Sequence, residues 1–244
     1  MDYNGFRIDE GRVTLLTFDN PRANILSTPV LNDLVRAFGV LNSTKENIRA
    51  LAITGTGATF CAGADIKEMS GFGPTEAMKF ARLIHRVMDL FEAFPRPVVA
   101  GVNGFALGGG LEMALSCDLV IASEKAVFGA PEINIGILPG AGGTQRLTRR
   151  LGRLKAKELI FTGRRVYAEE ALGLGLINRI VPADRLGLEL SNLVQLLASK
   201  PIQCLEAVKR LINSGSFEKE MELFSSMFSY EDQKRLMGEF LKKK

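Results

Sequence analysis

Glu112 lies two residues after three consecutive glycines, an arrangement that could polarise a carbonyl compound and transfer a proton to or from it. Gly108-Gly109-Gly110 lead into Leu111–Leu115, a run of strong helix formers. The first turn of a helix has N–H groups without an intrahelical partner, and glycine leaves them open to a ligand. Free amides beside a carboxylate suit addition to, or proton removal from, an activated carbonyl compound. A tight turn in an α/β core with a solvated Glu112 would give the same local pattern.

A second carboxylate and a second glycine-containing turn extend this chemistry. Glu132 follows Pro131 in an expected loop with mostly apolar neighbours, where burial would raise its pKa and suit a general acid. Taken by itself, Glu132 has the features of an ordinary exposed loop glutamate. Cys61–Met69 comes shortly after the buried strand expected over Arg49–Thr54, and Asp65 is placed to open a short helix. This segment, like the one around Gly108, offers amide donors after a strand.

The sequence lacks the motifs of several other kinds of active or binding site. Gly55–Phe60 begins like a dinucleotide fingerprint, but Phe60 replaces its third glycine, and the phosphate-binding pattern G-x-x-x-x-G-K-[ST] does not occur. His85 is the single histidine, and the sequence has no G-x-S-x-G motif whose serine it could activate as a general base. It lies in Thr75–Phe94 beside apolar residues at helical spacing, so a packing or capping role is predicted.

Composition narrows the class of protein further. The 244 residues are 46% hydrophobic with a net charge of +4 and a pI near 9.0, which suits an anionic ligand without requiring nucleic acid. Cys61, Cys117 and Cys204 are odd in number and lack metal-ligand spacing, which favours a reducing compartment. No signal peptide is visible, so the cytoplasm is expected. The apolar stretch Val98–Ser116 contains five glycines and is a poor membrane span, so no membrane association is expected.

The elements that must position these residues follow from hydrophobic periodicity. Strands are expected over Gly5–Asp9, Arg12–Asp19, Arg49–Thr54, Val98–Val102, Leu119–Ala122 and Ala126–Gly129. Helices are expected over Thr28–Leu41, Thr75–Phe94, Leu111–Leu115, Thr144–Leu151, Leu186–Ser199, Pro201–Ile212, Phe217–Phe228 and Asp232–Leu241. The β-β-α-β start indicates layered α/β architecture, and the end of the chain is helical.

The C-terminal helices carry an apolar face that needs a partner. Phe217, Met221, Phe224 and Phe228 share one side of their helix. A core contact and a subunit interface both explain this spacing.

Three segments resemble the enoyl-CoA hydratase/isomerase (crotonase) family, most closely its hydratases. They are FCAGADIKEM (Phe60–Met69), PVVAGVNGFALGGGLEMALSCD (Pro97–Asp118) and FGAPEINIGILPGAGGTQRL (Phe128–Leu147), with weaker similarity from Asn20 onward. The resemblance implies an α/β fold, a spiral of ββα units over residues 1–185, with a helical oligomerisation region over 186–244. Such chains form homotrimers, which commonly stack into homohexamers.

The resemblance also implies site roles at the matching positions. The amides of Ala64 and Gly109 would form an oxyanion hole for a thioester carbonyl, Glu112 and Glu132 would hold and activate water, and Gly140 would help to position it. The CoA part of the substrate would lie along Ala62, Gly63, Asp65, Ile66 and Lys67. Phe224 and Lys243 would reach CoA from a neighbouring subunit.

The implied reaction is the reversible addition of water to a 2-enoyl-CoA to give a 3-hydroxyacyl-CoA, as in fatty acid β-oxidation. Glu112 would mainly activate water and Glu132 would protonate C2; no metal or redox cofactor is needed. A Δ3,Δ2-enoyl-CoA isomerase is the nearest alternative, because one carboxylate near C2 can suffice. An RNA-binding protein on the same fold is a further alternative, given the basic pI, and an NAD-dependent oxidoreductase ranks last. Acyl length, branching, pathway and net direction stay open.

Overall fold

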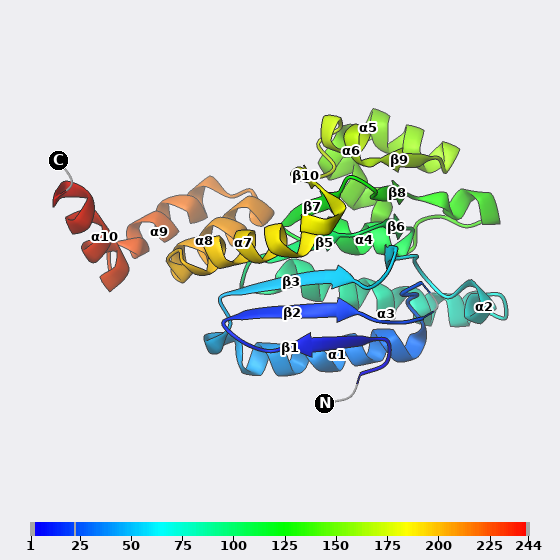
Figure 1. The fold of residues 1–244 in the computed structure, drawn as a ribbon, viewed down its shortest axis with the longest axis horizontal. Coiled ribbons are helices and arrows are strands. Elements are labelled where there is room, and N and C mark those ends of the chain that lie inside the picture. The colour runs from blue at the N-terminus through cyan, green and yellow to red at the C-terminus, as the bar shows by residue number, and fades with distance from the viewer. Residues whose placement is uncertain (1–2, 22, 243–244) are drawn as a thin grey trace.

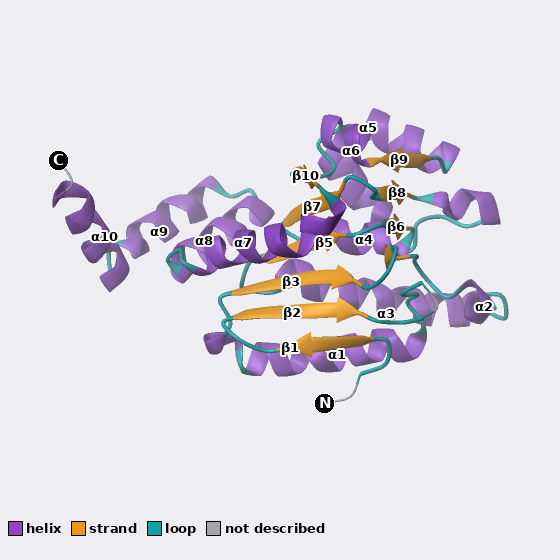
Figure 2. Ribbon diagram, viewed as in Figure 1, coloured by secondary structure: helices purple, strands orange, loops and turns teal. Residues whose placement is uncertain are grey.

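Two β-sheets alternate along the chain in a repeating ββα pattern (Figures 1 and 2). The computed structural model describes residues 3–21 and 23–242. Its strands are β1 (Phe6–Asp9), β2 (Val13–Phe18), β3 (Ala50–Gly55), β4 (Thr59–Cys61), β5 (Val98–Val102), β6 (Phe105–Leu107), β7 (Leu119–Ser123), β8 (Val127–Gly129), β9 (Arg165–Tyr167) and β10 (Arg179–Val181). Its α-helices are α1 (Thr28–Ser43), α2 (Ile66–Met69), α3 (Pro74–Ala93), α4 (Gly109–Leu115), α5 (Gly143–Thr162), α6 (Ala168–Gly173), α7 (Leu186–Ala198), α8 (Ile202–Ser214), α9 (Phe217–Met227) and α10 (Glu231–Lys242).

The order of the strands gives the spiral. The larger sheet runs β1-β2-β3-β5-β7-β10, and the smaller runs β4-β6-β8-β9. Each of β3, β5 and β7 is followed in the chain by β4, β6 or β8 in the other sheet and then by helical segments. Successive units therefore add one parallel strand to each sheet, which confirms the predicted spiral of ββα units.

The central strands are apolar throughout because helices cover both of their faces. On β3, Leu51 and Ile53 belong to the main core with α1 and α3, whereas Ala50 and Ala52 pack beneath α7. Leu190 of α7 lies in this second layer. The small alanines and glycines of β3 and β5 leave room for α7 to approach the sheet closely.

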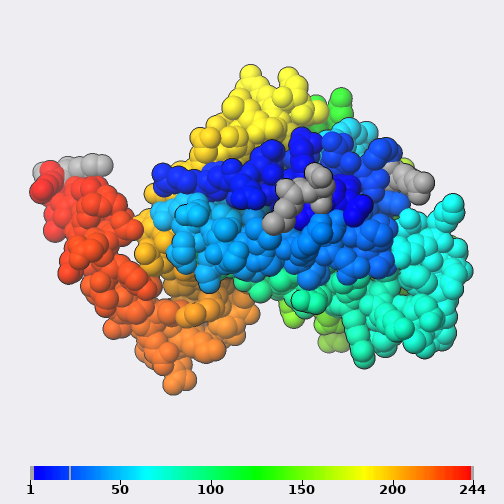
Figure 3. Space-filling view, turned by 90° about the horizontal axis from the view of Figure 1, so that it is seen from below, coloured from blue at the N-terminus to red at the C-terminus, as the bar shows by residue number. Residues whose placement is uncertain are grey.

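The last three helices project away from this core. Figure 3 shows residues of α8 to α10, in orange and red, extending from one end of the molecule. Their apolar side chains are largely exposed in the single chain, with Phe217 85%, Phe224 66% and Phe240 65% accessible. The predicted apolar face of Phe217–Phe228 is therefore present but uncovered by this chain.

The main differences from the predicted elements are in short or kinked segments. The smaller sheet was largely missed, because strands of three residues such as β4 and β6 are too short to show an alternating pattern. Pro131-Glu132 was expected in a loop but begins a 3₁₀ helix over Pro131–Ile135. Helix α5 continues well beyond Leu151 after a break at Gly152, whose φ is 78°.

Within the described part of the chain, no helix combines the length and the apolar character needed to cross a bilayer.

Candidate active site

A cavity of about 580 Å³ brings together the residues that the sequence predicted to do chemistry. It is lined by Ala64 after β4, by Gly109 and Glu112 of α4, and by Glu132 and Gly140 from the segments before α5. The rest of its wall is mostly apolar and includes side chains of α3. An apolar cleft with a few convergent polar groups is the typical form of a small-molecule site.

Two residues that line this cavity, Ala64 and Gly109, have their backbone amides close together. A methyl group built on Gly109 would lie 3.6 Å from the Ala64 nitrogen, and one built on Gly63 would lie 3.2 Å from the Gly109 nitrogen. In the described residues, neither the Ala64 amide nor the Gly109 amide has a recorded hydrogen-bond acceptor. Two such donors can bind one oxygen and stabilise negative charge that develops on it.

The glycine turn before α4 gives this geometry. Gly108 has φ of 53°, in the left-handed region that favours glycine, and it directs the chain from β6 into the helix. A methyl group on Gly110 would overlap the carbonyl oxygen of Cys61, so a side chain there would push α4 away from β4. The glycines thus bring the Gly109 amide close to the Ala64 amide.

Glu112 is buried and held in place by two amides. Its side chain is 3% exposed, and Oε1 accepts hydrogen bonds from the amides of Ala141 (2.8 Å) and Gly143 (2.6 Å). Burial and, to a smaller extent, the charge of Glu132 raise the pKa of this carboxyl group to about 7, although the two amides and the charge of Arg146 oppose the shift. A group with this pKa can accept a proton near neutral pH.

Glu132 shares the cavity and is less constrained. Its Oε1 would lie 3.1 Å from a methyl group built on Gly108, so the carboxyl group sits over the turn that opens α4. Burial raises its pKa, and its buried Oε2 has no hydrogen-bond partner among the described residues. An unpaired buried carboxyl oxygen is costly in a structural residue, and it is available to a ligand.

Only some residues of the segment predicted to border CoA line the cavity. Ala62, Gly63 and Ile66 line the cavity, whereas Asp65 and Lys67 are absent from its lining. Asp65 instead caps α2, as predicted, because its Oδ1 accepts from the amides of Lys67 (2.9 Å) and Glu68 (3.2 Å).

Two predicted residues belong to the C-terminal region. Phe224 lies on α9 outside the cavity lining, with its ring centroid 5.4 Å from that of Phe228. Lys243 falls outside the described residues. A contact of either residue with CoA stays a prediction.

The residues that hold Glu112 were missed by the sequence reasoning. Ala141 and Gly143 donate to its carboxylate, and the guanidinium of Arg146 donates to the carbonyl oxygen of Ala141 (2.8 Å). The signal that could have indicated them is the turn Pro139–Gly143 just before a helix, since glycine amides there are open to an anion. Gly140, predicted to position water, lies in the same turn and lines the cavity.

The remaining titratable candidates show no comparable arrangement. His85 is exposed on α3, outside the cavity lining and with no hydrogen bond in the described chain. Burial raises the pKa of the Cys61 thiol to about 12 and also raises that of Cys117, so neither is activated as a thiolate. In residues 3–21 and 23–242, no three His, Cys, Asp or Glu side chains are grouped to hold a metal ion.

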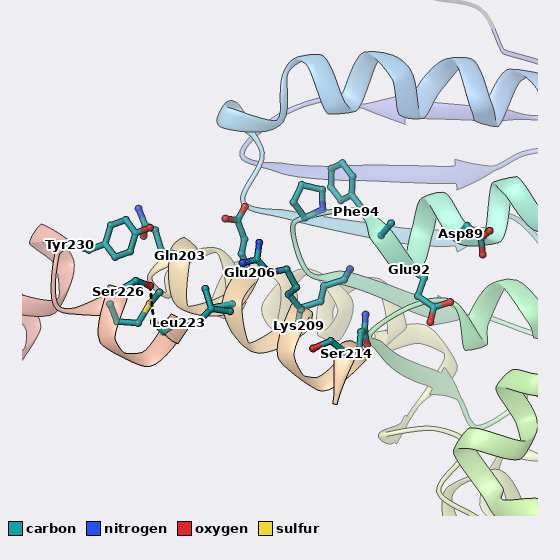
Figure 4. Close-up of a pocket in the computed structure, with 16 residues that line it drawn as sticks. Asp89, Glu92, Phe94, Gln203, Glu206, Lys209, Ser214, Leu223, Ser226 and Tyr230 are labelled. Atoms are coloured by element: carbon teal, nitrogen blue, oxygen red, sulfur yellow. Dashed lines mark hydrogen bonds between the residues drawn. The ribbon is translucent and has the colours of Figure 1, made fainter. Parts of the chain in front are cut away.

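A larger hollow of about 780 Å³ lies between the core and helices α8 and α9 (Figure 4). Asp89 and Glu92 of α3 lie at one end of it, and Gln203 and Tyr230 at the other. Its charged groups are largely engaged in contacts between core and helices, such as the ion pair of Glu206 with Arg96. Its carboxylates Asp89, Glu92 and Glu206 form ion pairs with Arg146 and Arg96. The carboxyl groups of the smaller cavity have no such ion pair among the described residues and lie beside two amides, so the smaller cavity is the better candidate site.

Proteins named enoyl-CoA hydratases are similar to this chain over almost its whole length. A short-chain-enoyl-CoA hydratase from Clostridium acetobutylicum is 40% identical over 96% of this chain and 93% of its own length. A crotonyl-CoA hydratase from Syntrophomonas wolfei is 38% identical over 96% of this chain and 94% of its own. The crystal structure of enoyl-CoA hydratase from Bacillus anthracis superposes with a TM-score of 0.93 at 34% identity, covering 99% of this chain and 97% of the other.

The family relationship extends along almost the whole sequence. The profile described as Enoyl-CoA hydratase/isomerase matches residues 9–244. This match, the near-full-length relatives and the ββα spiral confirm the resemblance seen in the three sequence segments and support a hydro-lyase. The chain belongs to the enoyl-CoA hydratase/isomerase family.

Proposed function

We propose that this protein is an enoyl-CoA hydratase, a hydro-lyase that adds water reversibly across the 2,3 double bond of a 2-enoyl-CoA thioester. The observation that carries the proposal is that two free amides and two carboxyl groups with raised pKa values line one cavity. The sequence relatives named as hydratases support the same reaction.

The thioester oxygen would accept hydrogen bonds from the amides of Ala64 and Gly109. Attack at C3 moves negative charge onto this oxygen, and losing one such donor typically lowers the rate by about 10²–10³. The charge forms in a largely apolar cavity, where each hydrogen bond is stronger than in water. The amides therefore stabilise the enolate-like transition state more than the neutral substrate.

Hydration needs one carboxylate and one carboxylic acid at the same time. Glu112 takes a proton from the water that adds to C3, and Glu132 gives its proton to C2. Burial and mutual repulsion raise the pKa of Glu112, and burial raises that of Glu132, so the pair can keep one proton near neutral pH. The proton gained by Glu112 balances the one lost by Glu132, and exchange with solvent restores the starting state.

The finer assignments follow the same family relationship. The CoA part would extend along Ala62–Lys67, with Gly140 beside the reacting water, and no metal or redox cofactor takes part. The exposed apolar side chains of α9 and α10 support a homotrimer or homohexamer, in which residues 186–244 form the oligomerisation region and Phe224 and Lys243 reach a neighbour's CoA. A reducing, cytoplasmic setting fits the three free cysteines, two of them buried.

The decisive assay incubates purified protein with crotonyl-CoA and follows the loss of the conjugated thioester by absorbance and the gain of one water by mass. We expect hydration, and we expect Glu132→Gln to abolish most of it. A 3-enoyl-CoA supplied in parallel tests the isomerase alternative, whose product has unchanged mass. Isomerisation without hydration, or salt-dependent RNA binding without activity on any enoyl-CoA, would refute the proposal.

A further inference from the structure

Arg146 is a buried charge close to Glu112 that the reaction itself does not require. It lies in the first turn of α5, is 9% exposed, and donates from Nη1 to the Ala141 carbonyl oxygen at 2.8 Å. Its other nitrogens donate to Glu92 Oε2 at 2.8 and 3.1 Å and to Asp89 Oδ1 at 3.2 Å. A buried arginine with this many partners fixes the backbone that it contacts.

The backbone that Arg146 contacts is the turn that holds Glu112. Residues 139–143 include Ala141 and Gly143, whose amides both donate to Glu112 Oε1. A methyl group on Gly142 would overlap the guanidinium, so the arginine packs directly on this turn. Three of the five residues are glycine, and such a segment loses much backbone entropy when it is fixed in one conformation.

The anchors of Arg146 lie on a different element. Asp89 and Glu92 belong to α3 and border the larger hollow shown in Figure 4. Arg146 therefore joins α3 to the turn, and the turn positions the carboxylate. We propose that Arg146 is a positioning residue, which clamps the 139–143 turn against α3 and so keeps two amide donors on Glu112. This inference rests on the proposed role of Glu112 as the base.

The charged groups around Glu112 set the sign of the expected effect. Burial and, to a smaller extent, Glu132 raise its pKa, whereas the two amides and Arg146 lower it. His85 of α3 lies beside the same turn, with Cε1 3.6 Å from a methyl group built on Gly142. Removing the arginine removes a cation and loosens both donors, so each change raises the pKa of Glu112 further.

The test compares Arg146→Gln and Arg146→Lys with Arg149→Gln. Arg149 is a matched control, because it lies on the same helix and its Nη1 is 3.6 Å from the same Glu92, yet its side chain is 71% exposed and makes no recorded contact with the turn. For Arg146→Gln we expect kcat to fall by roughly 10²-fold and the ascending limb of its pH profile to move up by roughly one unit, with KM little changed. Arg146→Lys should recover part of kcat, and Arg149→Gln should leave both quantities unaltered.

Hydrogen exchange gives a readout independent of catalysis. The amides of Ala141 and Gly143 should exchange faster in Arg146→Gln than in the wild type or in Arg149→Gln. If Arg146→Gln does not fold, Glu92→Gln provides the test, since it keeps the arginine and weakens its anchor. Unchanged exchange in the turn, or an unmoved pH limb in an active variant, would overturn the inference. A wild-type protein inactive on every enoyl-CoA would refute the proposed function instead, and the exchange comparison would still test the clamp.

Discussion

Replacement of Glu112 by glutamine separates the chemical role of the carboxylate from its cost to stability. Glutamine has nearly the same shape, and its carbonyl oxygen can still accept from the amides of Ala141 and Gly143. The fold should therefore persist while the base is lost. A general base contributes about 10²–10⁴ in rate, so kcat for crotonyl-CoA hydration should fall by that factor.

The same substitution should increase the stability of the fold although it lowers kcat. The pKa of Glu112 is about 7 in the folded protein and 4.5 in a free glutamate. Below pH 4.5 the carboxyl group is neutral in both the folded and the unfolded state, so it does not affect stability. Between the two pKa values the unfolded state loses its proton first, and the folded state becomes less stable as the pH rises. Above pH 7 the folded state carries the full cost of a buried charge. Each unit of difference between the folded and unfolded pKa is worth about 1.4 kcal/mol, so this cost is roughly 3 kcal/mol. Because the side chain is 3% exposed, solvent screening reduces it little.

Glu112→Gln should therefore be more stable than the wild type at pH 8, by up to roughly 3 kcal/mol, and by little at pH 4.5. Urea denaturation at both pH values and at one protein concentration measures this difference. Glu124→Gln, at an exposed glutamate, is the control and should show no such pH dependence. A Glu112→Gln variant that keeps near-normal turnover, or that is less stable at pH 8, would contradict the reasoning.

Three further predictions test the donors, the interface and a helix. Gly109→Pro removes one amide at a helix position that tolerates proline, so kcat should fall by about 10²–10³. Gly109→Ala is its control, because it crowds the same neighbours, Leu26 at 3.3 Å and Ile84 at 3.4 Å, but keeps the amide; equal losses would assign the effect to crowding. Phe224→Asp places a charge on an exposed apolar face of α9 and should shift the protein to smaller species in light scattering, whereas an unchanged mass would place Phe224 outside the interface. Gly39→Ala, inside α1 with open space around it, should raise the free energy of unfolding by about 0.5–1 kcal/mol in a denaturant titration, and a loss of stability would show that the glycine is needed there.

Local pattern was enough to predict most of the elements. The helices α1, α3, α8 and α9 begin and end close to their expected residues, because apolar spacing is a property of neighbouring residues. The smaller sheet could not be predicted in this way. Its strands are defined by pairing across the chain, as when β6 pairs with β4 and β8, and three residues carry too little pattern.

The candidate site shows the same division. Glu112, the glycines before it and Glu132 were indicated by residue type and local sequence, and the family resemblance added the amide of Ala64 and the roles of both carboxylates. The hydrogen-bond partners of Glu112 were not indicated by the sequence. Ala141 and Gly143 donate through backbone N–H groups, which do not depend on the type of side chain. Arg146 looks in the sequence like any helix surface arginine, and only its burial against Glu92 distinguishes it.

The sequence by itself determined the order of the main helices, the glycine turns and most strands of the larger sheet, and which carboxylates and amides were available for chemistry. Tertiary structure decided that Ala64 and Gly109, which are 45 positions apart, line one cavity with their amides close together. It also decided that Glu112 is buried with a pKa of about 7. The physical reason is that periodicity and backbone preference act between near neighbours. The distance between remote groups, and the loss of water around a charge, depend on how the whole chain packs.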